Sequence, residues 1–557
     1  MKVNVKNNTE ISFLKVFMFF MPFLFGGYHI WTSALFSVLL SVYLILFGKR
    51  NKISLSVTII SLLAIPLSYL VTTLWAVDSS TALYGFIKLL PVALFGMAVA
   101  PMKKEERAEI TDVIPYSAVA MGVLSYGLSL IPALSDFFLV ADRLGGFFQY
   151  PNTFACFCLT GIPVLLLKEK LTYKSWLLSA LLVGIILLTG SRTVFILLVL
   201  VAVIIFMKIG KKYRKGILCL FGGAVAVSLI VVLLTDSVQT VGRFLTISAE
   251  SSTLLGRLLY YKDALPVILK NPFGLGYYGY YFSQGSFQSG VYSVAFIHNE
   301  LLQLLLDIGW IPTALIVYVF IKSLTSKKNG MTERMILFII LSHSMLDFDL
   351  QFVCMFFVLI LNLDFDTVSV ARVKFSTAVL ATVLGALTLI SVYFGAVNVL
   401  YLTGQYEAVE KIYGKDTQSQ IFLMTEEKDY DRINSYAESV LSRNEYVSIA
   451  YSAKANYSFK NGDMKSFMDY KEKAIDTAAY SIDEYNSYCE KLITGINLYL
   501  RAGDRESASY CAGKLTEVAR MLEELRENTD ALAWKIKDKP ELELKEEISE
   551  YIKEITQ

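Results

Sequence analysis

Residues 296–310 have the sequence Phe-Ile-His-Asn-Glu-Leu-Leu-Gln-Leu-Leu-Leu-Asp-Ile-Gly-Trp and contain one of only three histidines in the chain. The apolar run after the histidine predicts a helix. His298 stands where this helix meets a long, partly polar segment, 235–297. The side of the membrane that this stretch faces, and the polar residues near it, therefore determine the possible role of His298.

The composition indicates a protein that crosses a membrane many times. The 557 residues are 55% hydrophobic and 18% charged, and the mean hydropathy is +0.52. Soluble proteins of this length need a more polar surface. Apolar runs of about 18–25 residues predict membrane spans, so we expect an all-α fold, a polytopic transmembrane helical bundle. About 12 or 13 spans are expected, near 11–26, 30–47, 53–75, 83–100, 113–133, 152–167, 175–190, 193–207, 216–234, 299–321, 335–348, 351–364 and 376–401.

Basic residues indicate which loops face the cytoplasm, because cytoplasmic loops carry an excess of Lys and Arg. The basic clusters fall in alternate loops if the N-terminus is also inside. The clusters are Lys49–Lys52, Lys103–Arg107, Lys168–Lys174, Lys208–Lys215, Lys327–Arg334 and Arg372–Lys374. No convincing cleavage site follows the first span, so it is expected to remain. The segment 235–297, His298 and the C-terminal part of the chain then face outward.

The chain divides into two parts of opposite charge. Residues 1–403 contain 30 Lys and Arg against 19 Asp and Glu, whereas residues 404–557 contain 21 against 30. We therefore expect a transmembrane domain over 1–403 and an acidic, water-soluble domain over 404–557.

Glycines that suit helix ends recur near the start of this acidic domain and within it, at Gly404, Gly462 and Gly503. The last two are 41 residues apart, which resembles degenerate tetratricopeptide-type (TPR-like) hairpins. Helical repeats of this kind bind a partner protein or pack on their own chain. Cys489 and Cys511 also lie here, and the sequence leaves open whether they form a disulfide.

The outer segment 235–297 is too long for a simple turn. Residues 257–270 have apolar side chains at helical spacing, so we expect an amphipathic helix along the membrane surface. Asn271-Pro272 ends this helix, and a glycine-rich loop follows. Its tyrosines suit an interfacial or sugar-facing position: Tyr277, Tyr278, Tyr280 and Tyr281.

Polar residues near the outer surface are the candidates for chemistry, because charges near a membrane are costly and need a reason. They are Arg143, Arg192, Arg257 and His298, with Asp347 and Asp349 in another outer loop. Arg192 could be a snorkelling interfacial residue or a phosphate ligand, since a guanidinium contacts phosphate oxygens in bidentate fashion. His298 could be a capping residue or a general base, because a helix N-terminus favours the neutral imidazole that a base requires. His343 could support the site or be a satisfied core histidine.

Other kinds of site are excluded by the sequence. It contains no GxxxxGK[ST] phosphate loop, no His-Glu-x-x-His and no outward carboxylate cluster with metal spacing, so no metal and no cofactor are expected. Gly274–Gly279 matches the dinucleotide pattern GxGxxG, but no strand is expected before it. Four cysteines lie in apolar runs and are expected to face lipid or the core: Cys156, Cys158, Cys219 and Cys354.

Four segments in order resemble the O-antigen ligase/polymerase superfamily. They are Arg143-Leu-Gly-Gly-Phe-Phe-Gln-Tyr-Pro-Asn152, Thr189-Gly-Ser-Arg192-Thr, Arg257 with Asn271-Pro-Phe-Gly-Leu-Gly276, and His298-Asn299-Glu-Leu-Leu-Gln with Gly309. The resemblance covers about residues 10–400. Thr193 replaces a small residue after the Ser-Arg pair, and Asp307 stands where glutamate is common.

The resemblance implies a metal-independent glycosyltransferase in a bacterial plasma membrane. It would move a glycan from a polyprenyl-pyrophosphate carrier, such as undecaprenyl pyrophosphate, to a glycan, lipid or protein acceptor on the outer face. Arg192 and Arg257 would bind the pyrophosphate, and His298 would take the proton of the acceptor hydroxyl. The supporting residues would be Arg143, Asn152, Asn299 and His343. Membrane lipid is an expected partner and nucleic acid is not.

Two alternatives to a ligase stay open. A repeat-unit polymerase would use the same residues to join units on one carrier. A non-enzymatic transporter would instead need polar residues near the middle of the membrane, and Lys88 is the main candidate.

Overall fold

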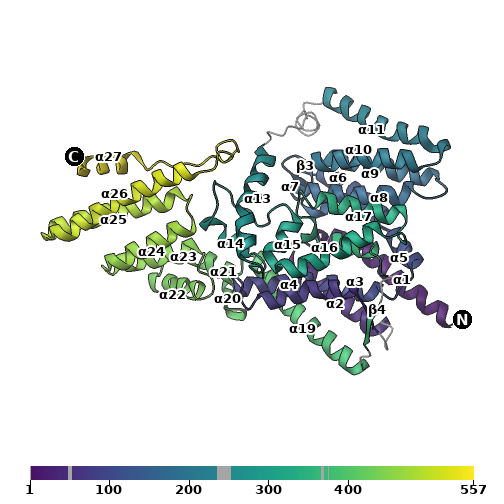
Figure 1. Ribbon diagram of the computed structural model, residues 1–557, viewed down its shortest axis with the longest axis horizontal. Helices are drawn as coiled ribbons and strands as arrows, with labels where there is room; N and C mark the ends of the chain where they lie inside the picture. The colour runs from purple at the N-terminus through teal and green to yellow at the C-terminus, as the bar shows by residue number, and fades with distance from the viewer. Residues whose placement is uncertain (1, 48–52, 235–251, 366–368, 374–375, 557) are drawn as a thin grey trace.

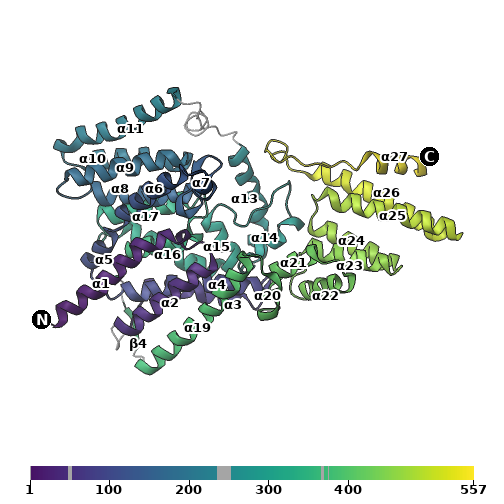
Figure 2. The same cartoon turned by 180° about the vertical axis from the view of Figure 1, so that it is seen from behind.

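The apolar segments form helices that pack side by side, with the acidic domain attached at one end of the bundle (Figures 1 and 2). The computed structural model describes residues 2–47, 53–234, 252–365, 369–373 and 376–556. The helices up to residue 402 are α1 (Lys2–Phe20), α2 (Ile30–Phe47), α3 (Val57–Thr72), α4 (Ser79–Val99), α5 (Lys104–Thr111), α6 (Ile114–Ser129), α7 (Pro132–Phe138), α8 (Pro151–Leu166), α9 (Tyr173–Thr189), α10 (Arg192–Lys208), α11 (Arg214–Leu234), α13 (Ser252–Lys270), α14 (Gly279–Ser283), α15 (Glu300–Ile308), α16 (Trp310–Thr325), α17 (Met331–His343), α18 (Val353–Leu361) and α19 (Thr377–Leu402).

The expected all-α fold is confirmed. Strands in the described part of the chain are limited to two short antiparallel ribbons. One pairs β1 (Ile53–Ser56) with β4 (Ser369–Val373), and the other pairs β2 (Leu139–Val140) with β3 (Arg143–Leu144).

Helices α4 and α18 form the centre of the bundle. Every residue of α18 is buried, and its Phe357 packs on Phe95 of α4 with ring centroids 4.5 Å apart. Phe17 of α1 contacts both rings. Other helices surround both, so apart from the first turn and Lys88 of α4 their side chains are mostly apolar on every side.

Three described helices are long and apolar enough to cross a membrane: α2, α4 and α19. Helices α3, α8, α9 and α16 are apolar but have only 16 or 17 residues. The prediction of a single span at 351–364 is wrong, because α18 has 9 residues and covers only about 14 Å. A buried short helix and a membrane span have the same hydropathy, which explains the error.

The expected span at 299–321 is also interrupted. It divides into α15 and α16 at Gly309, which has a φ of +81°. The loop Pro272–Gly276 docks at this break: the Trp310 N–H donates to the Pro272 carbonyl at 2.9 Å, and the Gly276 N–H donates to the Asp307 carbonyl at 3.0 Å. The break therefore anchors the loop after α13 to the helix that follows His298.

The loops that basic residues assign to one side lie at one end of the bundle. The pairing of β1 with β4 joins the connection after α2 to the connection before α19. Lys104 forms an ion pair with Glu333 at 3.0 Å and donates to the Lys328 carbonyl at 2.8 Å. This common end agrees with the expected alternation, whereas its assignment to the cytoplasm stays a prediction. The cluster Lys49–Lys52, Lys374 and the first part of the outer segment, 235–251, lie wholly or largely outside the described residues.

Helices α17 and α18 form a short pair joined by the turn 344–352. The Asn329 side chain, before α17, donates to the Asn362 carbonyl, after α18, at 3.0 Å. The Ser326 hydroxyl likewise donates to Asp364 at 2.7 Å. The start of α17 and the end of α18 therefore meet at the basic end of the bundle. The turn 344–352 that joins the two helices lies at the opposite end.

The acidic domain consists of consecutive helical hairpins, drawn in green to yellow in Figure 1. Its helices are α20 (Tyr406–Ile412), α21 (Thr417–Glu426), α22 (Tyr430–Leu441), α23 (Ser448–Lys460), α24 (Met464–Thr477), α25 (Ile482–Ala502), α26 (Arg505–Asn528) and α27 (Glu546–Thr556). Gly462 and Gly503 lie between paired helices, each with a φ of +77°, as the glycine pattern predicts. The relation to tetratricopeptide repeats stays a prediction. Cys489 and Cys511 are buried free thiols.

This domain packs on the outer segment of its own chain. Ala533 and Ile536 lie in one apolar cluster with Leu259 of α13. The Asp530 N–H donates to the Ser289 carbonyl at 2.9 Å. Of the two roles expected for the helical hairpins, packing on the same chain is therefore observed.

Gly309→Ala should destabilise the protein, because the new Cβ would lie 2.3 Å from the Pro272 carbonyl oxygen at a positive φ. Backbone strain alone costs about 1–3 kcal/mol, so we expect a lower thermal midpoint for the detergent-solubilised protein. The control is Gly184→Ala in α9, where no atom lies within 4 Å of the added Cβ. Equal midpoints for the two variants would contradict the docking of the Pro272–Gly276 loop at the helix break.

Candidate active site

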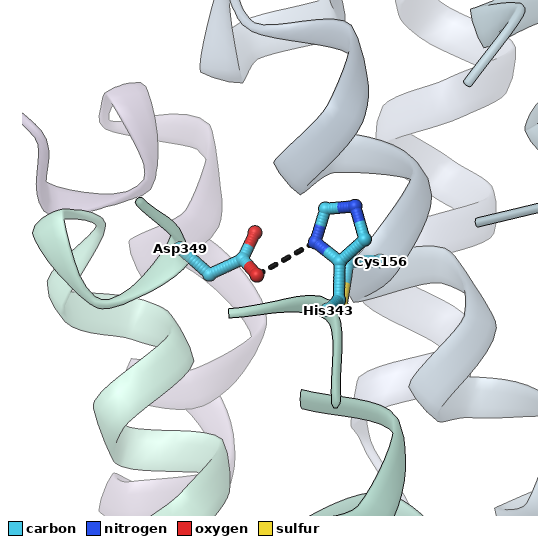
Figure 3. Close-up of side chains that lie close together, drawn as sticks. All are labelled: Cys156, His343 and Asp349. Carbon is cyan, nitrogen blue, oxygen red and sulfur yellow. Dashed lines mark hydrogen bonds and ion pairs between the residues drawn. The ribbon is translucent and has the colours of Figure 1, made fainter. Parts of the chain in front are cut away.

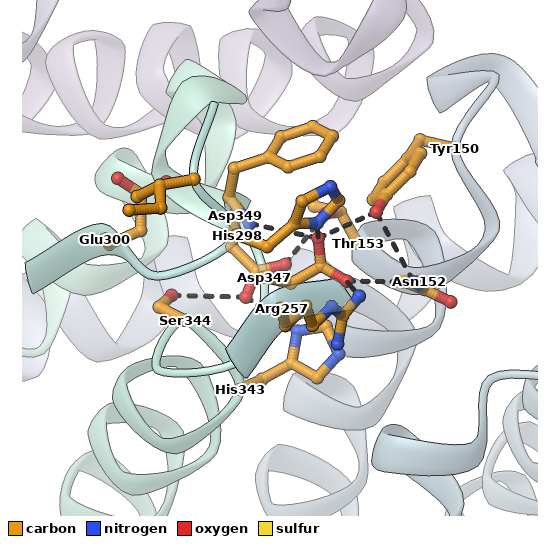
Figure 4. A network of polar contacts seen from close by, with 12 residues as sticks. Tyr150, Asn152, Thr153, Arg257, His298, Glu300, His343, Ser344, Asp347 and Asp349 are labelled. Carbon is orange, nitrogen blue, oxygen red and sulfur yellow. Dashed lines mark hydrogen bonds and ion pairs between the residues drawn. The ribbon is translucent and has the colours of Figure 1, made fainter. Parts of the chain in front are cut away.

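Asp347 lies at the centre of a polar network that joins separate segments of the chain (Figure 4). Its Oδ1 accepts from the Tyr150 hydroxyl at 2.7 Å and lies 3.2 Å from Nδ1 of His298. Its Oδ2 accepts from Asn152 at 2.8 Å and from the Arg257 guanidinium at 3.4 Å. Because Asp347 is 1% exposed, these partners stabilise its charge in place of water. The carboxylate thus brings three predicted residues, Asn152, Arg257 and His298, into one site.

His298 has a φ of +56°, a conformation that residues other than glycine rarely adopt. The surrounding structure holds it there. The Tyr261 hydroxyl donates to the His298 carbonyl at 2.7 Å. Asn299 caps α15 by accepting from the Leu302 N–H at 3.0 Å, and its amide donates to the Met345 carbonyl at 2.9 Å. His298 therefore stands at a helix start, as predicted, and Asn299 fixes that start to the turn that carries Asp347.

Arg143 connects the network to the turn between α9 and α10. Its guanidinium donates to the Asn152 side chain at 2.6 Å and to the Thr189 carbonyl at 2.7 Å. Thr189 ends α9, Gly190 has a φ of +59°, and Arg192 is the first residue of α10. The turn that carries Arg192 therefore lies beside the Asp347 network. Arg143 holds this turn in place, and its supporting role in the chemistry stays a prediction.

Helix α13 carries Arg257 and is tightly held on its inner face. Asp263 accepts from the Ser289 N–H at 2.9 Å and from the Tyr292 hydroxyl at 2.9 Å. Burial raises the pKa of Asp263, although these hydrogen bonds oppose the change. Leucines on another face are largely exposed: Leu258 at 46%, Leu265 at 50% and Leu269 at 67%. An exposed apolar face of this kind suits the expected position on a membrane surface.

His343 lies beside the Asp347 network, in a buried cluster around Asp349 (Figure 4). Its Nδ1 lies 2.6 Å from Asp349, whose carboxylate also accepts from the Thr153 hydroxyl at 2.7 Å and from the Ser344 hydroxyl at 3.1 Å. His343 and Asp349 are fully buried. His343 thus braces the turn after α17 through Nδ1, while its buried Nε2 has no hydrogen-bond partner among the described residues; its supporting role stays a prediction.

One group of possible metal ligands occurs among the described residues. Ligating atoms of Cys156, His343 and Asp349 lie within 4.8 Å of one another (Figure 3). Cysteine, histidine and aspartate are residues that bind zinc. However, hydrogen bonds from Thr153, Ser344 and His343 already account for the buried Asp349 carboxylate. We therefore assign this cluster a structural role.

The network sets the state of the His298 imidazole. An ionised carboxylate only accepts hydrogen bonds, so the proton shared with Asp347 belongs to Nδ1 of His298. In the neutral imidazole, Nε2 then has a lone pair that can accept a proton. Burial raises the pKa of Tyr150, and the Asp347 charge raises it further, so this phenol remains a donor. The site can therefore remove a proton from a hydroxyl close to an arginine that can hold an anion.

The sequence patterns assign no role to Tyr150 and leave Asp347 as a polar residue in an outer loop. The signal available for Asp347 is an acidic residue in a turn between apolar segments, where an uncompensated charge is costly. Its partners lie up to 197 positions away along the chain, so no local pattern could identify them.

Comparison with known families matches part of this site, but not the segments that carry Asp347 and Asn152. Residues 177–317 match the family model described as O-antigen ligase. The matched region includes Arg192, Arg257, His298 and Gly309. The comparisons with curated proteins and with solved structures found no match.

Asp349→Asn should lower the stability of the protein, because an amide cannot accept from three buried donors as a carboxylate does. We expect a loss of about 1–3 kcal/mol, measured as the thermal midpoint. Asp469→Asn, at an exposed position in the middle of α24, is the matched control and should leave the midpoint unchanged. The metal content of the purified protein tests the alternative. If the wild type holds one metal ion per chain and Cys156→Ser holds none, the cluster is a metal site.

Proposed function

We propose that this chain, a member of the O-antigen ligase/polymerase superfamily by its match over residues 177–317, transfers a glycan from a polyprenyl-pyrophosphate carrier to an acceptor hydroxyl. The reaction would take place on the outer face of a bacterial plasma membrane. The observation that carries the proposal is the Asp347 carboxylate, which joins a histidine with an available nitrogen to a guanidinium in one buried network.

In the proposed reaction His298 activates the acceptor. Its Nε2 takes the proton of the acceptor hydroxyl while the oxygen attacks the anomeric carbon of the donor glycan. The bond from that carbon to the pyrophosphate oxygen breaks, and the carrier leaves with the electron pair. Asp347 stabilises the resulting imidazolium through Nδ1 and keeps the ring in one orientation. The proton then passes to the departing pyrophosphate or to solvent.

Arg192 and Arg257 stabilise the leaving group in this proposal. The charge of the pyrophosphate grows as the bond breaks, and guanidinium groups provide planar, permanently charged donors for its oxygens. The contact of Arg257 with Asp347 orients the guanidinium at 3.4 Å. Arg143 and Asn152 act through position, because they fix the α9–α10 turn and Asp347. Such a reaction needs no nucleotide, since the energy is stored in the donor linkage.

A repeat-unit polymerase of the same superfamily is the alternative. It would use the same residues, with a second carrier-linked unit as the acceptor. The transport hypothesis loses support, because Lys88 is 1% exposed and bonds to the Tyr28 carbonyl, with its Nζ 4.6 Å from the Tyr28 ring centroid. These contacts account for its position without a transported solute.

His298→Ala should reduce glycan transfer by about 10²–10⁴-fold, the usual contribution of a general base. Arg192→Ala and Arg257→Ala should each reduce it by about 10²–10³-fold, since they remove stabilisation of the developing charge. The measurement is the turnover of the lipid-linked glycan in membranes that contain equal amounts of each variant. Loss of only the long products would indicate a polymerase, whereas loss of all acceptor-linked glycan would indicate a ligase.

The matched control is Arg520→Ala in α26, where the arginine side chain is 68% exposed; its transfer rate should equal that of the wild type. Normal transfer by His298→Ala at normal protein level would make the catalytic assignment wrong.

The orientation can be tested with single cysteines in a background without Cys219, the exposed native thiol. A membrane-impermeant thiol reagent should label Tyr510→Cys, in the acidic domain, in wall-free cells with an intact plasma membrane. Lys327→Cys, in a basic loop, should react only after permeabilisation. The reverse pattern would place the acidic domain and the Asp347 network on the cytoplasmic side.

A further inference from the structure

The outer segment and the acidic domain enclose two neighbouring cavities. The first, here named the tail cavity, has a volume of about 530 Å³ and lies between residues 281–293 and helices of the acidic domain. The second, here named the tyrosine cavity, has a volume of about 350 Å³ and reaches residues of α2, α4 and α19. Tyr281, Tyr401 and Gln418 line both cavities, so the two adjoin.

The lining of the tail cavity suits an uncharged ligand with many hydroxyl groups. Its lining residues include no Asp, Glu, Lys or Arg. Aromatic rings such as Tyr446 offer faces for the apolar side of a sugar ring. Gln418, Gln288 and Ser448 supply side chains that both donate and accept hydrogen bonds, as sugar hydroxyls require. A phosphate would find no cation there, and an acyl chain would leave these polar groups without partners.

The wall of the tail cavity is preformed. The Gln284 amide donates to the carbonyls of Tyr281 and Val294, and its oxygen accepts from the Val294 N–H. The Ala479 N–H donates to the Gly285 carbonyl at 3.2 Å and so ties the wall to the acidic domain. A wall held in this way loses little conformational freedom when a ligand binds.

The two cavities lead toward the Asp347 network. Ala295 lines the tyrosine cavity and is three residues before His298, a span of at most roughly 11 Å. The rings of Tyr278, Phe296 and Phe348 form a continuous series from that cavity to the imidazole, with centroid distances of 5.4 Å, 5.6 Å and, from Phe348 to His298, 4.9 Å. The tyrosine cavity therefore lies close to the Asp347 network, and the tail cavity adjoins it on the side away from that network.

We propose that the tail cavity binds an uncharged stretch of saccharide several units away from the reacting end of the glycan. The inference rests on the proposed function, because it assumes that a glycan is present at the Asp347 network. The saccharide could belong to the carrier-linked donor or to the acceptor, since both present the same hydroxyl chemistry. The acidic domain would then be a part of the substrate site.

Binding can be measured without transfer in the full-length His298→Ala protein. One probe is the oligosaccharide released by mild acid from the lipid-linked glycan of the producing cells, labelled with a fluorophore at its reducing end. The second is the glycan part of the acceptor, labelled in the same way. Gln418→Ala and Tyr446→Ala, each added to His298→Ala, should weaken binding of at least one probe by roughly five- to tenfold, the effect of one lost hydrogen bond or ring contact.

Tyr510→Ala, in the same His298→Ala protein, is the matched control, because this tyrosine is 59% exposed and lies outside the cavity lining. It should bind both probes as the parent does. The thermal midpoint of each variant shows that the fold is retained. A response to the donor probe alone or to the acceptor probe alone identifies the source of the saccharide, and either supports the proposal.

Unchanged binding in both cavity variants, or equal weakening in Tyr510→Ala, would overturn the proposal. So would the failure of the parent protein to bind either probe. This outcome can be told apart from the result of the transfer assay. If the wild-type protein transfers glycan but the cavity variants bind the probes normally, the proposed function stands and the cavity assignment is wrong. If glycan binding depends on Gln418 and Tyr446 but the wild-type protein transfers no glycan, the cavity assignment stands and the proposed function is wrong.

Discussion

A single buried carboxylate determines the arrangement of one end of this molecule. Asp347 is surrounded by Tyr150, Asn152, Arg257 and His298, which come from three segments far apart in the chain. Removing the partner of a buried charge costs about 3–5 kcal/mol, so the segments gain stability only when they assemble together. The residues proposed to bind and activate substrate are thus also those that hold the bundle closed at this end. Their geometry is fixed by the same energy that fixes the fold.

The break at Gly309 gives the second part of this arrangement. The loop Pro272–Gly276 fits against the break so closely that a Cβ on Gly274 would lie 2.5 Å from the Asp307 carbonyl oxygen. The loop follows α13, which carries Arg257, and the break follows α15, which begins after His298. Backbone hydrogen bonds across the break therefore set the position of the arginine helix relative to the histidine helix. The contacts of Arg257 and His298 with Asp347 then fix the two side chains within helices whose relative position the backbone hydrogen bonds have set.

Much of the helical fold could be predicted from hydropathy, but the lengths of individual helices could not. The runs at 299–321 and 351–364 are continuous in composition, yet one is divided at a glycine and the other is enclosed by protein. Arg257 and His298 could be singled out because costly charges near a membrane need a function. Asp347 and Tyr150 could not be linked to them, since pairing between distant positions leaves no local pattern. The packing of the acidic domain on α13 was equally inaccessible, because an amphipathic helix shows which face is apolar but not what covers it.

The short pair α17 and α18 places the proposed chemistry at a particular depth. Helix α17 has 13 residues, about 20 Å, whereas the hydrocarbon layer of a bilayer is about 30 Å thick. With the loops at its basic end on one surface, the turn that carries Asp347 would lie roughly 10 Å below the other surface. A carrier lipid embedded in the bilayer would then hold its pyrophosphate close to the level of this turn. The length of one helix would thus match the depth of the network to a donor that never leaves the membrane.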